Sequence, residues 1–476
     1  MSVYSGLYNS LLQASNHSAI ICRGESYSYE WLSKRVGFLS NWMLENTQVQ
    51  QPIVLYCPDH PDTYALLVAC LLTQRIPVPL HPGHPIDRNQ RILNQINPDW
   101  IVSPIPFANS ITPPEGSQPL SLTFSIPPEN NIAYILFTSG STGQPKGVMI
   151  SWKALHAFFE AVSQEKIEVN VNDRVLQMFD LTFDLSFFST LLPLISGATL
   201  VTVPEDEIKA FAIARLLEDE KITVALMVPS ILNLLYRFMD DLHFPDLRES
   251  LFCGEALNLK PTLAWKNCIP NATLRNVYGP TEATIFCSNY TLPNNPEDWE
   301  HQLGIISIGK PMPGTSFTLD PESGELWIGG NQLFSGYWKD KEKTNDKLIY
   351  YNDKLVYRSG DRAFLQNTNW LFTGRIDYQV KIQGYRIELG EIEFQLGEIL
   401  GNLKGVVLAI PNSFGHPELH AFIEDEETNA ERWRNGLAEK VPAYMVPVHW
   451  HGLPEFPLNV NGKIDRLALK NLKIHG

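Results

Sequence analysis

Hydroxyl residues alternate with glycines from Thr138 to Gly147, directly after a short apolar segment. Glycines let the backbone approach a phosphate closely, and hydroxyls and backbone N–H groups donate hydrogen bonds to its oxygens. Lys146 adds a positive charge to this stretch. The order of its last residues, Lys-Gly, differs from the Walker A pattern, in which the lysine follows a glycine. By composition alone, the stretch is either a phosphate-binding loop or a flexible surface loop.

The aspartate Asp184 lies inside the largely apolar run from Met178 to Leu194. An ionised carboxylate in such surroundings is costly to bury unless a cation pairs with it. The α-ammonium group of a bound amino acid would supply that cation. Asp180, four residues earlier in the chain, is the alternative carboxylate for the same role.

The overall composition excludes several classes of protein. The 476 residues are too many for one compact core and predict two to three folding units. The net charge of −15 argues against general nucleic-acid binding, which favours a basic face. The six cysteines are scattered and lack zinc-ligand spacing, the N-terminus does not resemble a signal peptide, and the longest apolar run is too short to span a bilayer. We therefore expect a cytoplasmic protein with no membrane or nucleic-acid partner.

Predicted strands and helices alternate over most of the chain. Hydrophobic periodicity predicts strands at 53–57, 76–80, 132–137, 199–203 and 224–228, and helices at 31–44, 64–72, 152–162 and 208–218. This alternation predicts an α/β fold with mostly parallel sheets. From about Gly324 the pattern changes to antiparallel strands, at 325–328 and 369–372. A smaller, more charged unit follows Arg375, with helices at 389–400 and 430–440 and a strand at 406–410.

The loop from Thr138 to Gly147 resembles the phosphate loop of the adenylate-forming superfamily. This superfamily includes acyl-CoA synthetases, luciferases and the adenylation domains of nonribosomal peptide synthetases. Further stretches resemble its motifs in the same order, and together they span residues 132 to 466. They are Tyr278–Thr284, Gly324–Gly329, Phe334–Tyr337, Tyr357–Asp361, Gly374–Asp377, Lys381–Arg386, Val441–Pro447 and Asn461–Arg466.

The resemblance implies two domains. A large N-terminal domain, residues 1–376, would contain α/β subdomains and a β-rich subdomain, and a small mobile α+β domain would cover residues 377–476. Asp377 would be the hinge between them. After adenylation the small domain would rotate and bring residues 381–386 towards the active site, where a phosphopantetheine thiol attacks the acyl-AMP.

The resemblance also implies a site for ATP and Mg²⁺, with Lys463, Glu282 and Thr138 as the catalytic residues. Glu282 would hold Mg²⁺, and Asp361 would accept hydrogen bonds from the ribose hydroxyls. Lys463 would bridge the substrate carboxylate and the phosphate oxygens, because an anionic nucleophile must approach an anionic phosphate. The residues implied to contact ATP are Thr138, Ser139, Gly140, Ser141, Thr142, Gly143, Lys146, Gly254, Glu255, Ala256, Asn276, Tyr278, Gly279, Thr281, Asp361, Phe372, Arg375 and Lys463.

Amino-acid activators of this superfamily pair an aspartate with the substrate ammonium group, and the resemblance selects Asp184 for this role. The lining of the implied pocket is apolar apart from Asp184 and Lys463, which excludes a charged substrate side chain. Its residues are Asp184, Leu185, Phe188, Leu226, Leu251, Cys253, Val277, Ile285, Phe286 and Lys463. L-Proline ranks first, because the pocket resembles that of free-standing prolyl-activating enzymes of pyrrole and anatoxin-type pathways. A small or branched apolar amino acid ranks second, and D-alanine ranks third, on a resemblance at Cys253.

The chain ends ten residues after Arg466 and carries no attachment motif of a carrier domain. We therefore expect an AMP-forming amino acid–carrier protein ligase that passes its aminoacyl group to the phosphopantetheine arm of a separate carrier protein. An acid–CoA ligase is one alternative, and Asp184 argues against it. An inactive, substrate-sensing relative is another; it would be expected to have lost Glu282, Asp361 or Lys463, and all three are present.

Overall fold

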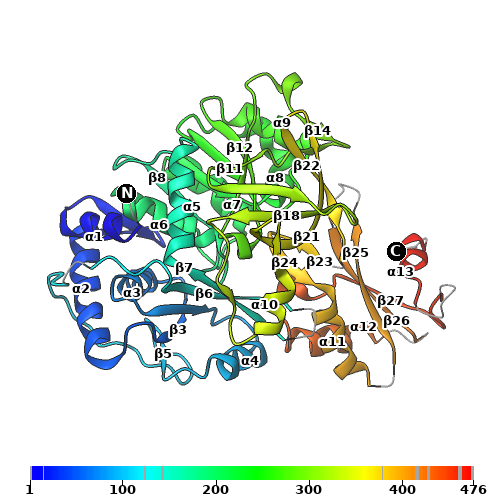
Figure 1. Cartoon of the computed structure of the whole chain (residues 1–476), viewed down its shortest axis with the longest axis horizontal. Coiled ribbons are helices and arrows are strands. Elements are labelled where there is room, and N and C mark those ends of the chain that lie inside the picture. The colour runs from blue at the N-terminus through cyan, green and yellow to red at the C-terminus, as the bar shows by residue number, and fades with distance from the viewer. Residues whose placement is uncertain are drawn as a thin grey trace. The chain divides into compact units, whose positions relative to one another are not determined.

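The computed structural model describes residues 3–13, 15–122, 125–140, 144–377, 379–401, 403–412, 417–425, 429–458 and 464–472. These residues divide into two compact units. Unit 1 comprises 1–82, 96–137 and 147–376, and unit 2 comprises 83–95, 138–146 and 377–476. Figure 1 labels the helices and strands of both units.

The largest sheet of unit 1 has nine strands, in the order β16-β13-β12-β11-β10-β8-β9-β1-β2. The six strands from β12 to β1 are parallel to their neighbours, and antiparallel strands complete both edges. Parallel strands joined through helices confirm the predicted α/β class. The strands are β1 (Ser18–Cys22), β2 (Glu25–Ser28), β8 (Arg174–Gln177), β9 (Thr199–Thr202), β10 (Val224–Met227), β11 (Glu249–Phe252), β12 (Thr273–Tyr278), β13 (Ser288–Thr291) and β16 (Lys310–Pro311).

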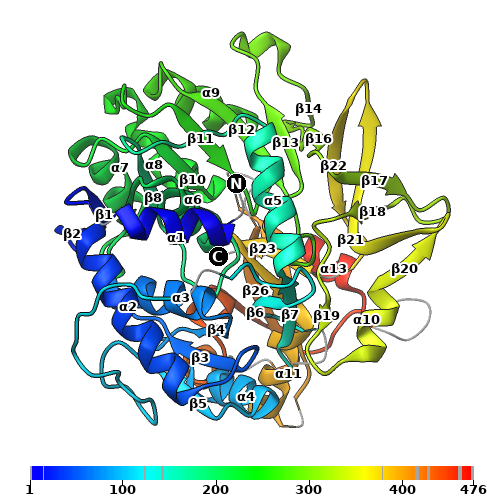
Figure 2. The same cartoon turned by 60° about the vertical axis from the view of Figure 1, so that its left-hand side comes forward.

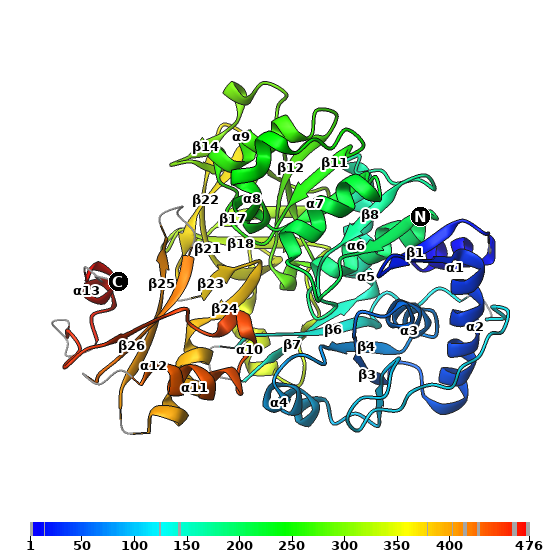
Figure 3. The same ribbon diagram turned by 180° about the vertical axis from the view of Figure 1, so that it is seen from behind.

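Side chains alternate between the two faces of this sheet, as the period of a strand requires. On β10, Val224 and Leu226 join one hydrophobic cluster, whereas Ala225 and Met227 join another. The first cluster takes side chains from α1 (Val3–Gln13), α2 (Tyr29–Asn46), α3 (Pro61–Leu72), α5 (Trp152–Gln164) and α6 (Leu185–Ser196), with α1 packed beside α6 (Figure 2). The second takes side chains from α7 (Lys209–Asp219), α8 (Pro229–Leu235) and α9 (Leu259–Cys268), which cover the other face (Figure 3).

Among the described residues, unit 1 also contains three smaller sheets of more than two strands. The first is parallel and contains β4 (Ile76–Leu80), β3 (Pro52–Tyr56) and β5 (Trp100–Val102). The second contains β19 (Gly336–Tyr337), β7 (Lys146–Ser151) and β6 (Ile132–Thr138), with β19 antiparallel to β7. The third is antiparallel and contains β17 (Thr315–Leu319), β18 (Glu325–Gly330), β20 (Leu348–Tyr351), β21 (Lys354–Gln366) and β22 (Asn369–Arg375). The strands predicted at 325–328 and 369–372 are thereby confirmed. In the described part of the chain, no helix combines the length and apolar character that crossing a bilayer requires.

Unit 2 mixes helices with short strands. Its three-stranded sheet contains β25 (Gly405–Pro411), β26 (Pro417–Ile423) and β27 (His449–Gly452), and β23 (Gln379–Ile382) pairs with β24 (Tyr385–Glu388). Its helices are α4 (Ile86–Ile96), α11 (Leu389–Leu400), α12 (Ala430–Ala438) and α13 (Arg466–Asn471). The helix predicted at 389–400 is confirmed, the helix predicted at 430–440 ends two residues earlier, and the strand predicted at 406–410 gains one residue at each end.

The C-terminal segment of unit 2 begins at Asp377, the predicted hinge. Two segments that the sequence placed in the large domain, 83–95 and 138–146, group with it. Arg88 in the first segment forms a buried ion pair with Glu391 at 2.7 Å. In the second segment, the Ser139 hydroxyl donates a hydrogen bond to the Arg386 carbonyl at 2.7 Å. The limits 1–376 and 377–476, and the hinge role of Asp377, stay predictions.

Candidate functional site

The apolar residues predicted to line the substrate pocket gather in one place. All of them belong to the cluster on the same face of the nine-stranded sheet: Leu185, Phe188, Leu226, Leu251, Cys253, Val277, Ile285 and Phe286. They lie on or just beyond strands β10, β11 and β12 and on α6, which follows β8. The carboxyl ends of parallel strands share one edge of a sheet, and this edge is the usual position of ligand sites in open α/β folds.

Three aromatic rings of this cluster contact one another. Phe158 and Phe286 meet edge to face, with ring centroids 4.8 Å apart. Phe188 contacts Phe286 at 5.3 Å and Phe158 at 6.2 Å, again at steep angles. All three side chains are fully buried. Edge-to-face packing is the favoured arrangement of aromatic pairs, so the rings hold one another in place.

Asp184 occupies the position that precedes the first turn of α6 and is 8% exposed. The positive end of the helix dipole favours a carboxylate at that position. Together with burial, the Asp184 charge raises the pKa of Tyr134 well above its ordinary value. Tyr134, on β6, stacks on Phe187 with centroids 4.0 Å apart. Among the described residues its hydroxyl has no hydrogen-bond partner. The sequence analysis did not single out Tyr134, because in an apolar strand a tyrosine resembles a core residue.

A buried network connects three residues predicted for the nucleotide site. Asp361 on β21 is 1% exposed, and the guanidinium of its direct cross-strand neighbour, Arg375, binds its Oδ1 at 2.5 Å. The hydroxyl of Tyr278, at the end of β12, donates to the other carboxylate oxygen at 2.5 Å. Burial, followed by the Asp361 charge, raises the pKa of Tyr278 well above its ordinary value, so this residue stays a neutral donor. The structure thus brings together predicted residues that are about eighty positions apart in the sequence.

Another buried carboxylate is Glu282, in the 3₁₀ turn η2 (Thr281–Ala283). Its side chain is fully buried, and the Tyr337 hydroxyl donates to Oε1 at 2.8 Å. Tyr337 closes the motif that begins at Phe334, yet the sequence assigned it no role. Its position within a matching motif was the signal that could have identified it.

The backbone beyond Glu282 is strained. Thr284 and Ile285 have φ angles of 55° and 71°, a region that β-branched residues rarely adopt. Gln332 holds this segment: its Nε2 donates to the Phe286 carbonyl at 2.9 Å, and its own carbonyl accepts from the Thr284 hydroxyl. Such strain persists only where surrounding contacts enforce it, and it is frequent at functional sites.

The other residues predicted for ATP in unit 1 have more varied surroundings. Asn276 is buried, and its amide donates to the carbonyls of Ser307 at 2.8 Å and Ile306 at 3.3 Å. Glu255 accepts from the Ser230 N–H at the start of α8, at 2.8 Å. Gly254, Thr281 and Phe372 are half-buried, and Ala256 is exposed. Gly279 lies so close to the segment that precedes β13 that a Cβ there would be 2.4 Å from Phe286 Cα.

The described part of the phosphate loop belongs to unit 2. Thr138 Oγ1 is buried without a hydrogen-bond partner among the described residues. The Ser139 hydroxyl also accepts from the Glu388 N–H at 3.2 Å. Burial raises the pKa of Glu391, although a hydrogen bond with the Gly140 backbone favours the ionised form of its carboxyl group. Lys146 is buried. Four predicted site residues lie outside the described residues: Ser141, Thr142, Gly143 and Lys463.

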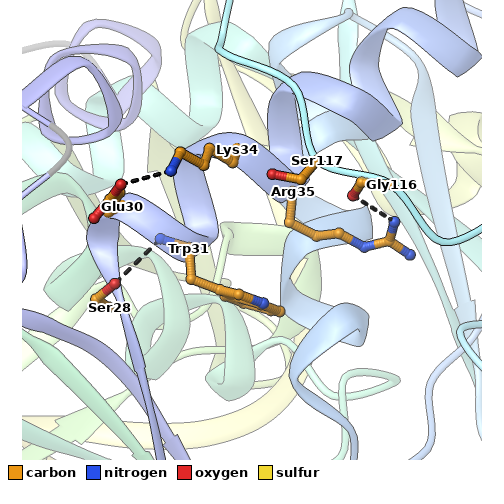
Figure 4. A pocket seen from close by; sticks show the side chains of 7 residues that line it. All are labelled: Ser28, Glu30, Trp31, Lys34, Arg35, Gly116 and Ser117. Atoms are coloured by element: carbon orange, nitrogen blue, oxygen red, sulfur yellow. Dashed lines mark hydrogen bonds and ion pairs between the residues drawn. The ribbon is translucent and has the colours of Figure 1, made fainter.

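A separate hollow of about 280 Å³ lies beside the start of α2 (Figure 4). Its polar groups already bind one another: Lys34 pairs with Glu30 at 2.5 Å, and the Arg35 guanidinium donates to the Gly116 carbonyl at 3.2 Å. The residues that line it include none of those predicted for ATP or the amino acid. It therefore adds nothing to the candidate site.

Comparisons with known proteins place this geometry in context. The AMP-binding enzyme family matches residues 8–338. Tyrocidine synthase 3 of Brevibacillus parabrevis is 37% identical over 362 residues, which cover 72% of this chain but 5% of the synthase. The chain spans 5 to 13% of the length of this and four further peptide synthases that it matches.

Other relatives match over most of their length. D-Alanine–D-alanyl carrier protein ligase of Staphylococcus aureus (strain Newman) is 30% identical over 441 residues, which cover 88% of both chains. Among solved structures, the Vibrio cholerae adenylation domain AlmE in complex with glycyl-adenosine-5'-phosphate superposes with a TM-score of 0.84. It is 25% identical, and the match covers 98% of this chain and 97% of AlmE.

The first prediction concerns the buried Asp361. Arg375→Met removes the cation that pairs with this carboxylate, and an uncompensated buried charge costs about 3–5 kcal/mol. We expect a large fall in the melting temperature of the purified protein, measured by thermal unfolding. Arg362→Met is the control. It changes an exposed arginine on β21, the strand of Asp361, and should cost at most about 0.5 kcal/mol. Equal effects of the two substitutions would contradict the assigned ion pair.

The second prediction concerns the close approach at Gly279. Gly279→Ala forces the new methyl group against the backbone of Phe286, so we expect destabilisation of about 1–3 kcal/mol in thermal unfolding. Gly397→Ala is the control, because that exposed glycine lies in α11 with open space around its Cβ position. Alanine in an exposed helix should stabilise by about 0.5–1 kcal/mol. A neutral Gly279→Ala would show that the backbone approach is not required.

Proposed function

Because the chain belongs to the AMP-binding enzyme family, whose members use ATP to form adenylates, we propose that it is an amino acid–carrier protein ligase. One observation carries the proposal: the buried Asp184 lies between the parallel strand β8 and helix α6, directly before Leu185 of the hydrophobic cluster, and its charge acts on Tyr134 of the same cluster. A carboxylate there suits the ammonium group of an amino acid, a group that a fatty or aryl acid does not carry.

The cluster beside Asp184 favours a small, uncharged side chain. Phe188 and Phe286 fill the space next to α6 with edge-to-face contacts, and every predicted lining residue beyond Asp184 in unit 1 is apolar. Charged side chains would lose their hydration there without gaining a partner. The Tyr134 hydroxyl has no hydrogen-bond partner among the described residues and is acted on by the Asp184 charge, so it is a further polar group that a bound amino acid could contact.

Among small amino acids, the relatives support D-alanine before L-proline. The staphylococcal relative that the chain covers at 88% is a D-alanine–D-alanyl carrier protein ligase, and AlmE holds a glycyl adenylate. Cys253, fully buried in the cluster, is the residue whose surroundings resemble those ligases in sequence. L-Proline, which the sequence favoured, stays a prediction that these relatives do not support.

The proposed reaction has two steps. A substrate carboxylate oxygen attacks the α-phosphorus of ATP, a P–O bond forms, and the bond to the β-phosphate breaks so that pyrophosphate leaves. The thiolate of a phosphopantetheine arm then attacks the carbonyl carbon, the thioester forms, and AMP leaves with the electron pair of the C–O bond. The first step joins two anions, so positive charge near the phosphate has to stabilise the transition state. Lys463 is proposed for that task.

The residues present fit ATP and Mg²⁺. Thr138 Oγ1 is a buried hydroxyl without a partner among the described residues, as expected where a phosphate oxygen would accept from it. Tyr278 and Arg375 orient Asp361, the residue proposed to bind the ribose hydroxyls. Mg²⁺ prefers oxygen ligands and, when bound, would neutralise phosphate charge beside the Glu282 carboxylate.

Ser139 suggests how unit 2 takes part. Its hydroxyl binds the backbone of β24 through Arg386 and Glu388. A triphosphate would compete for the same hydroxyl, so we infer that these two hydrogen bonds break when ATP binds and form again as it leaves. This exchange links the phosphate loop to the strand that the sequence predicted to move between the two steps.

The third prediction tests the function directly. ATP–pyrophosphate exchange should depend on a small amino acid, with D-alanine above L-proline in a panel of substrates. Asp184→Asn removes the charge that pairs with the ammonium group, so kcat/KM should fall by a factor of about 10²–10³, equivalent to about 3–4 kcal/mol. The fall should appear mainly in KM for the amino acid.

Asp180→Asn is the matched control, because it removes the alternative carboxylate four residues away. It should leave KM for the amino acid within a factor of about three, the range of ordinary surface substitutions. If none of the amino acids in the panel supports ATP–pyrophosphate exchange, the proposed ligase activity is refuted. Exchange with L-proline but not D-alanine would reverse the substrate order. An Asp180 effect equal to that of Asp184 would refute the ammonium contact.

The fourth prediction separates the two half-reactions. Lys463→Ala should lower the adenylation rate by a factor of about 10²–10³, as for the loss of one charge-stabilising donor. Thioester formation from supplied aminoacyl-AMP should be largely unchanged, measured as loading of a phosphopantetheinylated carrier protein. Lys470→Ala, an exposed lysine of α13, is the control and should leave both rates unchanged. Equal loss of both half-reactions in Lys463→Ala would contradict the proposed role.

A further inference from the structure

Three histidines and one glutamate share one face of the β26–β27 pair in unit 2. Glu418 and His420 lie on β26, and His449 and His451 lie on β27. The two strands are parallel, with His420 opposite His449 and Phe422 opposite His451. Because alternate residues of a strand point to the same side, the Glu-x-His and His-x-His patterns place all four side chains together.

The polar atoms of this group are already close. Nε2 of His449 lies 3.0 Å from Oε2 of Glu418, and Nδ1 of His420 lies 3.0 Å from Nε2 of His451. The rings of His420 and His449 stack with centroids 4.3 Å apart. Candidate ligand atoms of Glu418, His420 and His449 all lie within 4.8 Å of one another.

The opposite face of the two strands packs against hydrophobic side chains of unit 2. Leu419, Ala421 and Trp450 point to the other face and pack in the main hydrophobic cluster of unit 2. On the histidine side, the fully buried Phe422 packs against the His451 ring at 4.8 Å. His449 is exposed, so an ion can reach the group from solvent.

We propose that Glu418, His420, His449 and His451 form a binding site for Zn²⁺ that ties β27 to β26. Three imidazole nitrogens and one carboxylate oxygen are ligands that Zn²⁺ binds in tetrahedral geometry. With bonds of about 2.0–2.1 Å, neighbouring ligand atoms of a tetrahedral ion lie about 3.3 Å apart. The two 3.0 Å pairs are close to that separation, and bringing His451 into the shell requires it to move toward Glu418 and His449, with which it does not share the 4.8 Å group. Mg²⁺ prefers an all-oxygen shell and would not compete here.

The experiment uses the full chain without an affinity tag and ZnCl₂ as the probe. Equilibrium dialysis followed by metal analysis should find one Zn²⁺ per chain, with none bound when MgCl₂ replaces ZnCl₂. The double variant His420→Gln/His449→Gln should weaken Zn²⁺ binding at least about tenfold. His301→Gln, an exposed histidine of unit 1, is the control and should bind as the unchanged protein does.

A second variant guards against loss of the fold. Glu418→Gln keeps the size of the side chain but removes its charge, and it should also weaken Zn²⁺ binding. Zn²⁺ should raise the melting temperature of the unchanged protein and not that of either variant, because a ligand stabilises the state that binds it. Failure of the unchanged protein to bind Zn²⁺, or equal binding by the double variant, would overturn the proposal. Neither result would bear on the ligase activity, because the assay contains no ATP or amino acid.

Discussion

Desolvation of the Asp361 carboxylate is the constraint on which the candidate site of unit 1 depends. A carboxylate that is 1% exposed has to be paired, and the structure provides one cation and one neutral donor. Arg375 comes from the neighbouring strand of the antiparallel sheet, and Tyr278 comes from the end of a parallel strand. The same three residues therefore join the antiparallel sheet to the edge where the nine-stranded sheet carries its site.

Glu282, a few residues beyond Tyr278, is likewise a buried carboxylate with a hydrogen-bonded partner. It is fully buried, bound by Tyr337, and followed by two residues with positive φ that Gln332 holds in place. Strain of this kind costs about 1–3 kcal/mol per residue. The surrounding hydrogen bonds offset that cost, so the segment from Tyr278 to Phe286 is held in one shape between the nucleotide residues and the apolar cluster.

Unit 2 carries chemistry of a different kind. It contains the described part of the phosphate loop, whose Ser139 binds the backbone of β24, and the histidine face of β26 and β27. The first feature concerns groups that we propose exchange partners during the two-step reaction. The second concerns groups already arranged by strand register. The proposed Zn²⁺ site would stiffen β27, and none of its four ligands is a residue proposed for catalysis.

Local sequence was sufficient for several features. The apolar period of 389–400 defines α11, because a 3.6-residue pattern is a property of consecutive residues. The motif series also predicted Asp184, Asp361 and the apolar pocket residues, and the fold gathers the apolar ones in one cluster. Only tertiary structure decided the partners: Tyr337 for Glu282, Gln332 for the strained turn, and His449 opposite His420. These pairs are separated by 29 to 55 positions, and such contacts depend on strand register and burial rather than on neighbouring residues.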